Sequence, residues 1–127
     1  MRLKYHCMAT IITLALSGTA LAACNKPQLP DIADGASASQ AVMVESQKAV
    51  KQYLGEGERY LACLQEQEKT VVAEAKAAGV EPESEEAAAL KEKKIAINEA
   101  YNHVVDAMHD LGDRFNAEVK KYKAANK

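Results

Sequence analysis

The sequence predicts an all-α fold: an antiparallel two-helix hairpin, coiled-coil-like, with an extended N-terminal arm packed back on the first helix. Three observations support this prediction. Apolar residues recur at helical spacing over two long segments. A short connection containing a glycine and a proline separates these segments, and helices joined so closely lie antiparallel. A proline-containing stretch before the first segment favours an extended course.

Residues 1–22 have the features of an export signal. Arg2 and Lys4 form a basic start, residues 8–21 are largely apolar, and residues 20–22 (Ala-Leu-Ala) offer a cleavage site. The apolar run is too short to span a bilayer comfortably. We therefore predict a signal peptide over residues 1–22 and a mature periplasmic chain of about 105 residues, which is one small domain. Removing Arg2 and Lys4 from the 16 basic residues leaves 14 against 18 acidic ones, which argues against a nucleic-acid partner.

Cys24 allows two incompatible interpretations. Cys7 leaves with the signal peptide, so Cys24 and Cys63 remain as a pair in an oxidising compartment, where disulfides form. Against pairing, residues 21–24 (Leu-Ala-Ala-Cys) resemble the lipobox that directs acylation of its cysteine. In that case Cys24 would anchor an outer-membrane lipoprotein, and Cys63 would be left alone.

A comparison of lengths favours the disulfide. After a turn at Asp34-Gly35, Ser37 and Gln40 form a capping-box pattern that predicts a helix start near Ser37. From Ser37 to Cys63 a helix rises about 39 Å. From Cys24 to Ser37 a polyproline-like arm covers about 40 Å. An arm folded back along the helix would therefore deliver Cys24 beside Cys63, and lipidation of Cys24 stays the alternative.

Sequence signals at the ends of the two helical segments set the predicted boundaries. Gly79 is a natural end for the first helix, and Ser84 followed by two glutamates suits the start of the second. The predicted elements are an extended arm over 23–36 and a helical hairpin over 37–127, made of a helix over 37–78, a turn over 79–83 and a helix over 84–125.

Both helices carry apolar residues every seven positions. This spacing predicts a coiled-coil-like seam, which in the second helix extends over four heptads. In the first helix the series is Met43, Val50, Leu64 and Val71, with Gly57 in register and Leu54 and Leu61 alongside. In the second helix it is Leu90, Ile97, Val104 and Leu111, with Tyr101, Met108, Phe115 and Tyr122 on the neighbouring row.

A second stripe on the first helix predicts where the arm lies. Tyr53, Tyr60 and Cys63 flank the main seam at helical spacing, on the side away from Leu54 and Leu61. We expect Leu54 and Leu61 to face the second helix and the two tyrosines to receive the arm. The arm residues predicted to pack on Tyr53 and Tyr60 are Pro27, Leu29, Pro30 and Ile32.

Glycines interrupt both predicted helices. Gly55 and Gly57 each cost about 1 kcal/mol relative to alanine in a helix interior. Close packing against a neighbour is the favoured explanation, with a local break in the helix as the alternative. Gly112 is expected to serve the same purpose in the second helix.

A stretch covering residues 24–64 resembles a known pattern. The Cys-Asn-Lys-Pro of 24–27, the Leu-Pro-Asp of 29–31 and the Tyr-Leu-Ala-Cys-Leu of 60–64 look like a motif of small exported α-helical proteins of Gram-negative bacteria. The resemblance implies a paired use of Cys24 and Cys63. It brings no reaction and no function with it.

Residues able to perform chemistry are few. His109 and Asp113 are four positions apart and form a weak candidate pair for a divalent metal, whereas a solvated polar face explains the same residues. Tyr101, Met108 and Phe115 at heptad spacing indicate core rather than a haem pocket. We predict neither a cofactor nor an enzymatic activity.

The predicted role is therefore structural. We expect a non-enzymatic periplasmic protein that self-associates or binds another exported protein, with a homodimer forming a four-helix bundle because two helices bury only one face each. The alternative is an outer-membrane lipoprotein anchored through Cys24, acting as a spacer or accessory subunit, and membrane contact is predicted only in that case. A metal or small-ligand carrier is the third class.

Overall fold

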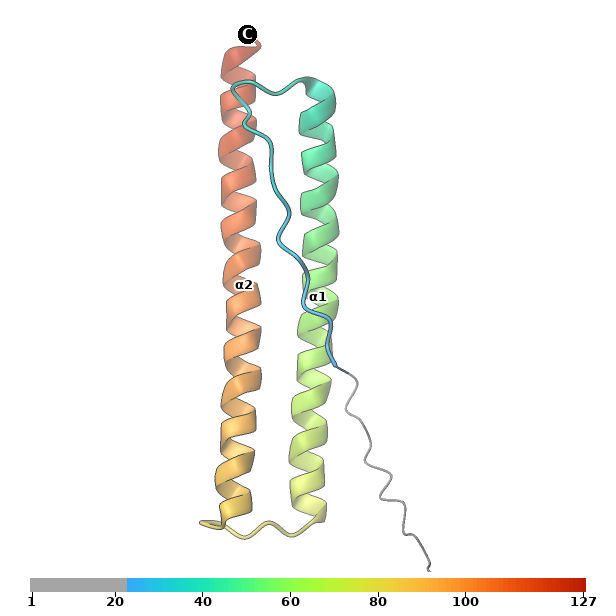
Figure 1. The fold of residues 1–127 in the computed structure, drawn as a ribbon, viewed down its shortest axis with the longest axis vertical. Coiled ribbons are helices and arrows are strands. Elements are labelled where there is room, and N and C mark those ends of the chain that lie inside the picture. The colour runs from blue at the N-terminus through green and yellow to red at the C-terminus, as the bar shows by residue number, and fades with distance from the viewer. Residues whose placement is uncertain (1–22) are drawn as a thin grey trace, which may run out of the picture.

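The computed structural model describes residues 23–127, and the predicted signal peptide, with Cys7, lies outside the described residues. The described chain folds into two antiparallel helices, α1 (Gln40–Ala77, 38 residues) and α2 (Glu85–Ala125, 41 residues), which lie side by side (Figure 1). The predicted all-α hairpin is confirmed. Within residues 23–127, neither helix contains a stretch that is both long and apolar enough to cross a bilayer.

The connection between the helices is built from two capping motifs. Gly79 has a φ of 65°, and the Val80 N–H donates to the Ala75 carbonyl at 3.1 Å, which closes α1 with a Schellman motif. Ser84 caps α2, because its hydroxyl accepts from the Ala87 N–H at 3.0 Å. The predicted end of the first helix at residue 78 and the predicted start of the second at Ser84 are thus each displaced by one residue.

The start of α1 differs from the prediction. The helix begins at Gln40, and its N-cap is Ser39, whose hydroxyl accepts from the Val42 N–H at 3.3 Å. Ser37, the predicted cap, instead donates from its hydroxyl to the Asp34 carboxylate at 3.1 Å. The turn at Asp34-Gly35 was predicted correctly, but it engages Ser37 and delays the helix.

The predicted heptad seam forms the core, although unevenly. The α1 series is buried along its whole length, from Met43 to Val71. In α2, Val104 and Leu111 are 1% and 0% exposed, whereas Leu90 and Ile97 of the same series are only half-buried. Full burial in α2 is therefore confined to the half of the hairpin that the arm covers.

The arm forms a third layer, as predicted. It runs from the middle of α1 to the C-terminal end of α2 and then crosses to the start of α1 (Figure 1). Ile32 packs against a cluster of Val50, Tyr53 and Leu111. Cys24 packs against a second cluster, which contains Tyr60, Leu64 and Val104. Leu54 and Leu61 also pack against these two clusters, which contain Leu111 and Val104 of α2.

Leu29 is the arm residue for which the packing prediction is wrong. Its side chain is 50% exposed. Pro27 is buried and Pro30 is half-buried. They belong to a series in which every third residue from Cys24 to Ala33 is at least partly buried, and Ile32 is partly buried in addition. Three residues per turn is the repeat of a polyproline helix, so a chain with Pro27 and Pro30 facing inward turns Leu29 toward solvent.

The glycine predictions hold at one position of three. A Cβ added to Gly57 would lie 2.6 Å from the Met108 sulfur, so close packing explains this glycine. A Cβ at Gly55 would meet only the Arg59 guanidinium at 3.9 Å, and one at Gly112 would meet nothing within 4 Å. The packing explanation is wrong for Gly55 and Gly112, and both helices continue through them.

Candidate functional site

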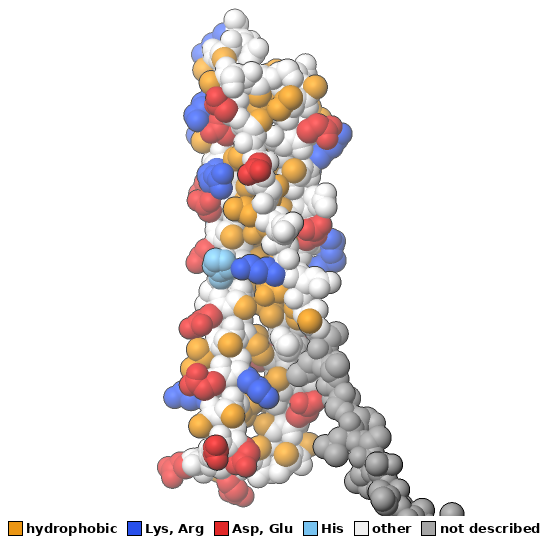
Figure 2. Space-filling view, viewed as in Figure 1, with side chains coloured by type: hydrophobic (Ala, Val, Ile, Leu, Met, Phe, Trp, Pro, Cys, Tyr) orange, Lys and Arg blue, Asp and Glu red, His pale blue; other side chains and the backbone are white. Residues whose placement is uncertain are grey.

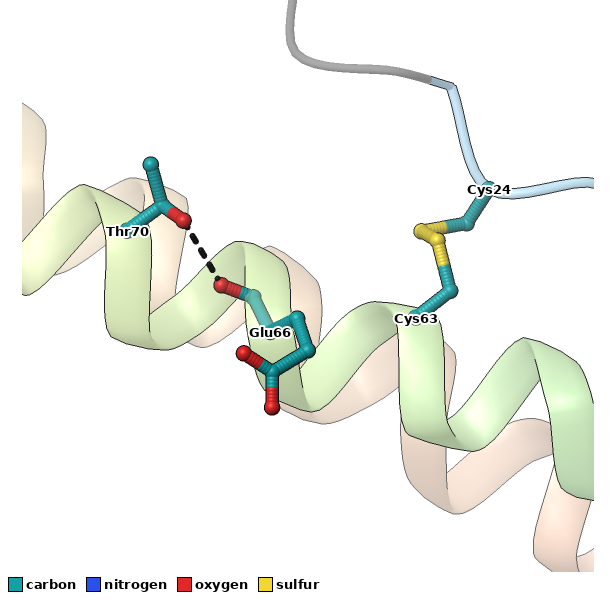
Figure 3. Close-up of a disulfide and its surroundings, with 4 residues drawn as sticks. All are labelled: Cys24, Cys63, Glu66 and Thr70. Atoms are coloured by element: carbon teal, nitrogen blue, oxygen red, sulfur yellow. Dashed lines mark hydrogen bonds between the residues drawn. A yellow bond between two sulfur atoms is a disulfide. The ribbon is translucent and has the colours of Figure 1, made fainter.

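The arm is held to the hairpin at three points, of which the first is covalent. Cys24 and Cys63 form a disulfide with their Cα atoms 5.8 Å apart (Figure 3). The pairing predicted from the lengths of arm and helix is confirmed. Because a sulfur in a disulfide has no valence left for a thioether, Cys24 cannot carry a lipid while it is bonded to Cys63.

Just past the disulfide, α1 presents polar groups. The Thr70 hydroxyl donates to the Glu66 carbonyl at 2.9 Å, and both side chains are exposed (Figure 3). The arm reaches α1 at Cys63, and within residues 23–127 it makes no hydrogen bond to this outer surface. The disulfide therefore marks where coverage of the hairpin by the described arm stops.

The second attachment is a hydrogen bond to a buried hydroxyl. The Ala33 N–H donates to the Ser46 Oγ at 3.0 Å, and Ser46 is buried although it is polar. The sequence interpretation missed Ser46. A signal was present, since Ser46, Tyr53 and Tyr60 are spaced by seven residues and share one face of α1.

The third attachment joins the arm to α2. The Gly35 N–H donates to the Glu118 Oε2 at 2.9 Å. A Cβ at Gly35 would overlap the Glu118 carbonyl oxygen and lie 2.9 Å from the Tyr122 nitrogen, so the two backbones can approach only at a glycine. Sequence analysis treated Gly35 as part of a turn and missed Glu118. The available signal was that Glu118 follows Leu111 by seven residues and places a charge in an apolar series.

Charged groups surround this third attachment. Lys121 donates to the Glu118 carboxylate at 2.7 Å, and the Glu118 side chain is 17% exposed. The hydrogen bond from Lys121, followed by that from the Gly35 N–H, lowers the pKa of Glu118 below its ordinary value. The same contact raises the pKa of Lys121. The Ala36 N–H, and then the Ser37 hydroxyl, lower the pKa of Asp34.

Beyond the disulfide, the face that carries the arm continues as an open apolar groove of about 480 Å³. We call it the arm-side groove. Figure 2 shows hydrophobic side chains on this face between the two helices, below the arm. The groove starts at Ala23, Cys24 and Tyr60, and its remaining lining is Leu64, Gln67 and Val71 from α1 and Lys93, Ala96, Ile97 and Ala100 from α2.

A second groove of about 670 Å³ shares no lining residue with the first. It is more polar, with Lys91 and Lys94 beside Leu90 and Ile95, and Ile95 is 41% exposed. These two grooves are therefore open surfaces of different character.

The weak metal candidates are on the surface. His109 and Asp113 are both exposed on α2. Within residues 23–127, no group of three or more potential metal-ligating side chains gathers around them or elsewhere. The structure thus brings no third ligand to this pair among the residues it describes.

Comparisons of the chain with protein-family models, with curated proteins and with solved structures find no match. The resemblance seen over residues 24–64 stays a prediction.

Proposed function

We propose that this chain is an exported, non-enzymatic protein-interaction protein of the periplasm. One observation carries the proposal. The arm covers the hairpin from its open end to the disulfide, but beyond the disulfide the α2 seam residues Leu90 and Ile97 are only half-buried, whereas Val71 of α1 is buried. Apolar side chains at seam positions are normally buried, so incomplete burial at a regular seam favours a surface that a partner completes.

Two further features support export. The predicted signal peptide directs the chain out of the cytoplasm, and a structural disulfide such as Cys24–Cys63 persists in oxidising compartments. The resemblance over residues 24–64 to small exported proteins of Gram-negative bacteria points the same way.

Self-association is the simplest form of this role. Two copies that bring their uncovered halves together would complete a four-helix bundle, which is a common arrangement for paired hairpins. A stable dimer would have to bury about 600 Å² or more on each copy. The two open grooves give a second copy or another exported protein two surfaces on which to bind.

Site-specific photo-cross-linking in the periplasm tests the proposal. A photoreactive side chain at Ala96 probes the arm-side groove, and one at Ile95 probes the second groove. Ala117, which is exposed on α2 and lines neither groove, is the matched control. We expect a discrete product from Ala96 or Ile95 and none from Ala117, and a product of twice the protein mass identifies a homodimer. Equal labelling at all three positions, or none at any, contradicts the proposal.

The lipoprotein alternative rests on residues 21–24 and requires a different chemical state of Cys24. Lipidation requires a free sulfur on Cys24, whereas the bridge removes two hydrogens from the intact mass of the mature chain. Mass spectrometry under non-reducing conditions therefore separates the two forms. We expect the bridged form, and an acylated Cys24 would place the protein on the membrane.

A further inference from the structure

We propose that the arm-side groove binds an extended, proline-containing segment of a partner protein, laid end to end with the arm of this chain. The inference rests on the proposed interaction role and assigns one of the two grooves to one class of ligand. Continuity is the first argument. The groove lies between the same two helices as the arm and begins at Cys24 and Tyr60, which also belong to the packing of the arm.

The arm shows what kind of chain this face accepts. In the covered half, an extended segment turns an apolar side chain inward on every third residue, with Ile32 in addition, and leaves most of the residues between them exposed. Such a chain needs few hydrogen bonds to the surface on which it binds, because a polyproline backbone remains solvated. Past the disulfide, the largely buried Leu64 and Val71 and the half-buried Ile97 form the apolar floor of the groove.

Once the predicted signal peptide is removed, the arm itself cannot fill the groove. Its disulfide to Cys63 fixes Cys24 at the entrance. Cleavage after residue 22 would leave Ala23 as the residue preceding Cys24, and one residue cannot reach Val71. A second hairpin is a poorer occupant of this face, because the arm stands above the plane of the two helices and hinders broad contact.

The dimensions and charge of the groove define the ligand further. From Tyr60 to Val71, α1 rises about 16 Å, which corresponds to about five residues of polyproline chain. Lys93 lines the groove and favours a carboxylate in the ligand. The expected ligand is therefore a segment of about five residues with two proline or aliphatic side chains three apart, followed by an acidic residue.

Residues 27–32 of the chain (Pro-Gln-Leu-Pro-Asp-Ile) satisfy this description and supply the probe. An acetylated, amidated peptide of this sequence is titrated into the oxidised chain of residues 23–127 while methyl NMR signals are recorded. The peptide cannot displace the arm, because the disulfide keeps the arm at a high effective concentration. We expect saturable shift changes at Leu64, Val71 and Ile97, and none at Leu90.

Two matched variants test the location. Ala96→Glu places a carboxylate in the groove and is expected to lower the affinity for the peptide by about tenfold or more. Ala89→Glu makes the same change at an exposed alanine of α2 outside both grooves and should alter the affinity by less than about twofold. Lys93→Gln should lower the affinity for this peptide by up to about fivefold. The affinity for the same peptide with its aspartate replaced by asparagine should stay unchanged.

Three results would overturn the assignment. The first is a titration in which the peptide produces no saturable shift, although a photoreactive side chain at Ala96 or Ile95 still gives a cross-linked product. In that case the proposed interaction role survives and only the ligand assignment fails. Another is a set of shifts centred on Leu90 and Ile95. The third is a change in the Leu64, Val71 and Ile97 signals with protein concentration alone, which would assign the groove to a second copy.

Discussion

The covered half of the hairpin and the half beyond the disulfide share the same two helices and the same heptad series, and the α1 series is buried in both halves, but the α2 series is not. In α2, Val104 and Leu111 of the covered half are almost completely buried, whereas Leu90 and Ile97 of the uncovered half are not. The spacing of the residues is identical, so the spacing does not cause the difference. Two helices enclose one stripe between them, and the arm supplies the third surface that completes burial.

The two halves also differ in how they are held. The covered half has a covalent bridge, a hydrogen bond to a buried hydroxyl and a hydrogen bond to a carboxylate, all from the arm. Among residues 23–127, the uncovered half is held by the contact between α1 and α2 and by the capped turn alone. Stability is thus concentrated in one half of the molecule, and open apolar surface in the other.

Removing the disulfide should have the largest effect. Replacing Cys24 and Cys63 together by serine frees a loop closed across a sequence separation of 39 residues. The chain-entropy estimate for such a loop is a loss of about 4 kcal/mol in the free energy of unfolding. Urea denaturation measures this loss, and hydrogen exchange should show it first at Ala33 and Gly35. An unchanged free energy of unfolding would mean that the arm does not stabilise the covered half.

Truncating equivalent leucines compares the two halves directly. Leu111→Ala opens a cavity at a side chain that is 0% exposed and should cost about 3 kcal/mol. Leu90→Ala removes the same atoms from a half-buried position and should cost about 1 kcal/mol. Both values come from chemical denaturation of the oxidised protein. Equal losses would show that the two halves are equally well packed and would remove the basis for the comparison.

Much of the fold could be predicted from the sequence because it depends on local or periodic signals. The heptad series identified which face of each helix is apolar, and Gly79 marked where α1 ends. The disulfide followed from two lengths, each fixed by a regular rise per residue. The half-burial of Leu90 and Ile97 did not follow, because a heptad series defines a face without telling what covers it.

The details of the arm depend on contacts that leave no periodic signal in the arm itself. Gly35 meets Glu118 across 83 positions of sequence. No rule for a turn glycine reveals that its missing side chain is needed for a remote helix. Leu29 was misplaced for a similar reason, because apolarity alone does not determine which way an extended segment faces. The partner-binding role of the grooves stays a proposal, since the covering chain is not part of this sequence.

Two glycines provide a smaller test of the same contrast. Gly35→Ala forces the arm away from the backbone of α2 and should cost roughly 2 kcal/mol. Gly112→Ala adds a methyl group in open space within α2 and should stabilise the protein by up to about 1 kcal/mol. Thermal and urea unfolding should therefore move in opposite directions for the two variants. Destabilisation of similar size at both positions would contradict the close approach at Gly35.

The smallest expected effect is a response to acid at the junction between the arm and α2. The pKa of Glu118 lies below its ordinary value of 4.5 in the folded protein, chiefly because of Lys121 and then the Gly35 N–H. A carboxyl group with a lowered folded pKa stabilises the folded state fully above its unfolded value, and this contribution is lost as the pH falls through the folded value. The arm should therefore loosen at Gly35 below about pH 4.5, while Cys24 stays bonded to Cys63.

Hydrogen exchange and the NMR shift of the Gly35 amide between pH 6 and pH 2 measure this loosening. Glu118→Gln should remove most of the pH response, because the side chain no longer titrates. Asp34 also has a lowered pKa, owed first to the Ala36 N–H, so Asp34→Asn should remove only the remainder. Glu45→Gln is the matched control, since Glu45 pairs with Lys48 at 2.7 Å as Glu118 pairs with Lys121 but does not touch the arm. If Glu45→Gln abolished the response as well, the loosening would reflect the net charge of the protein rather than the attachment at Gly35.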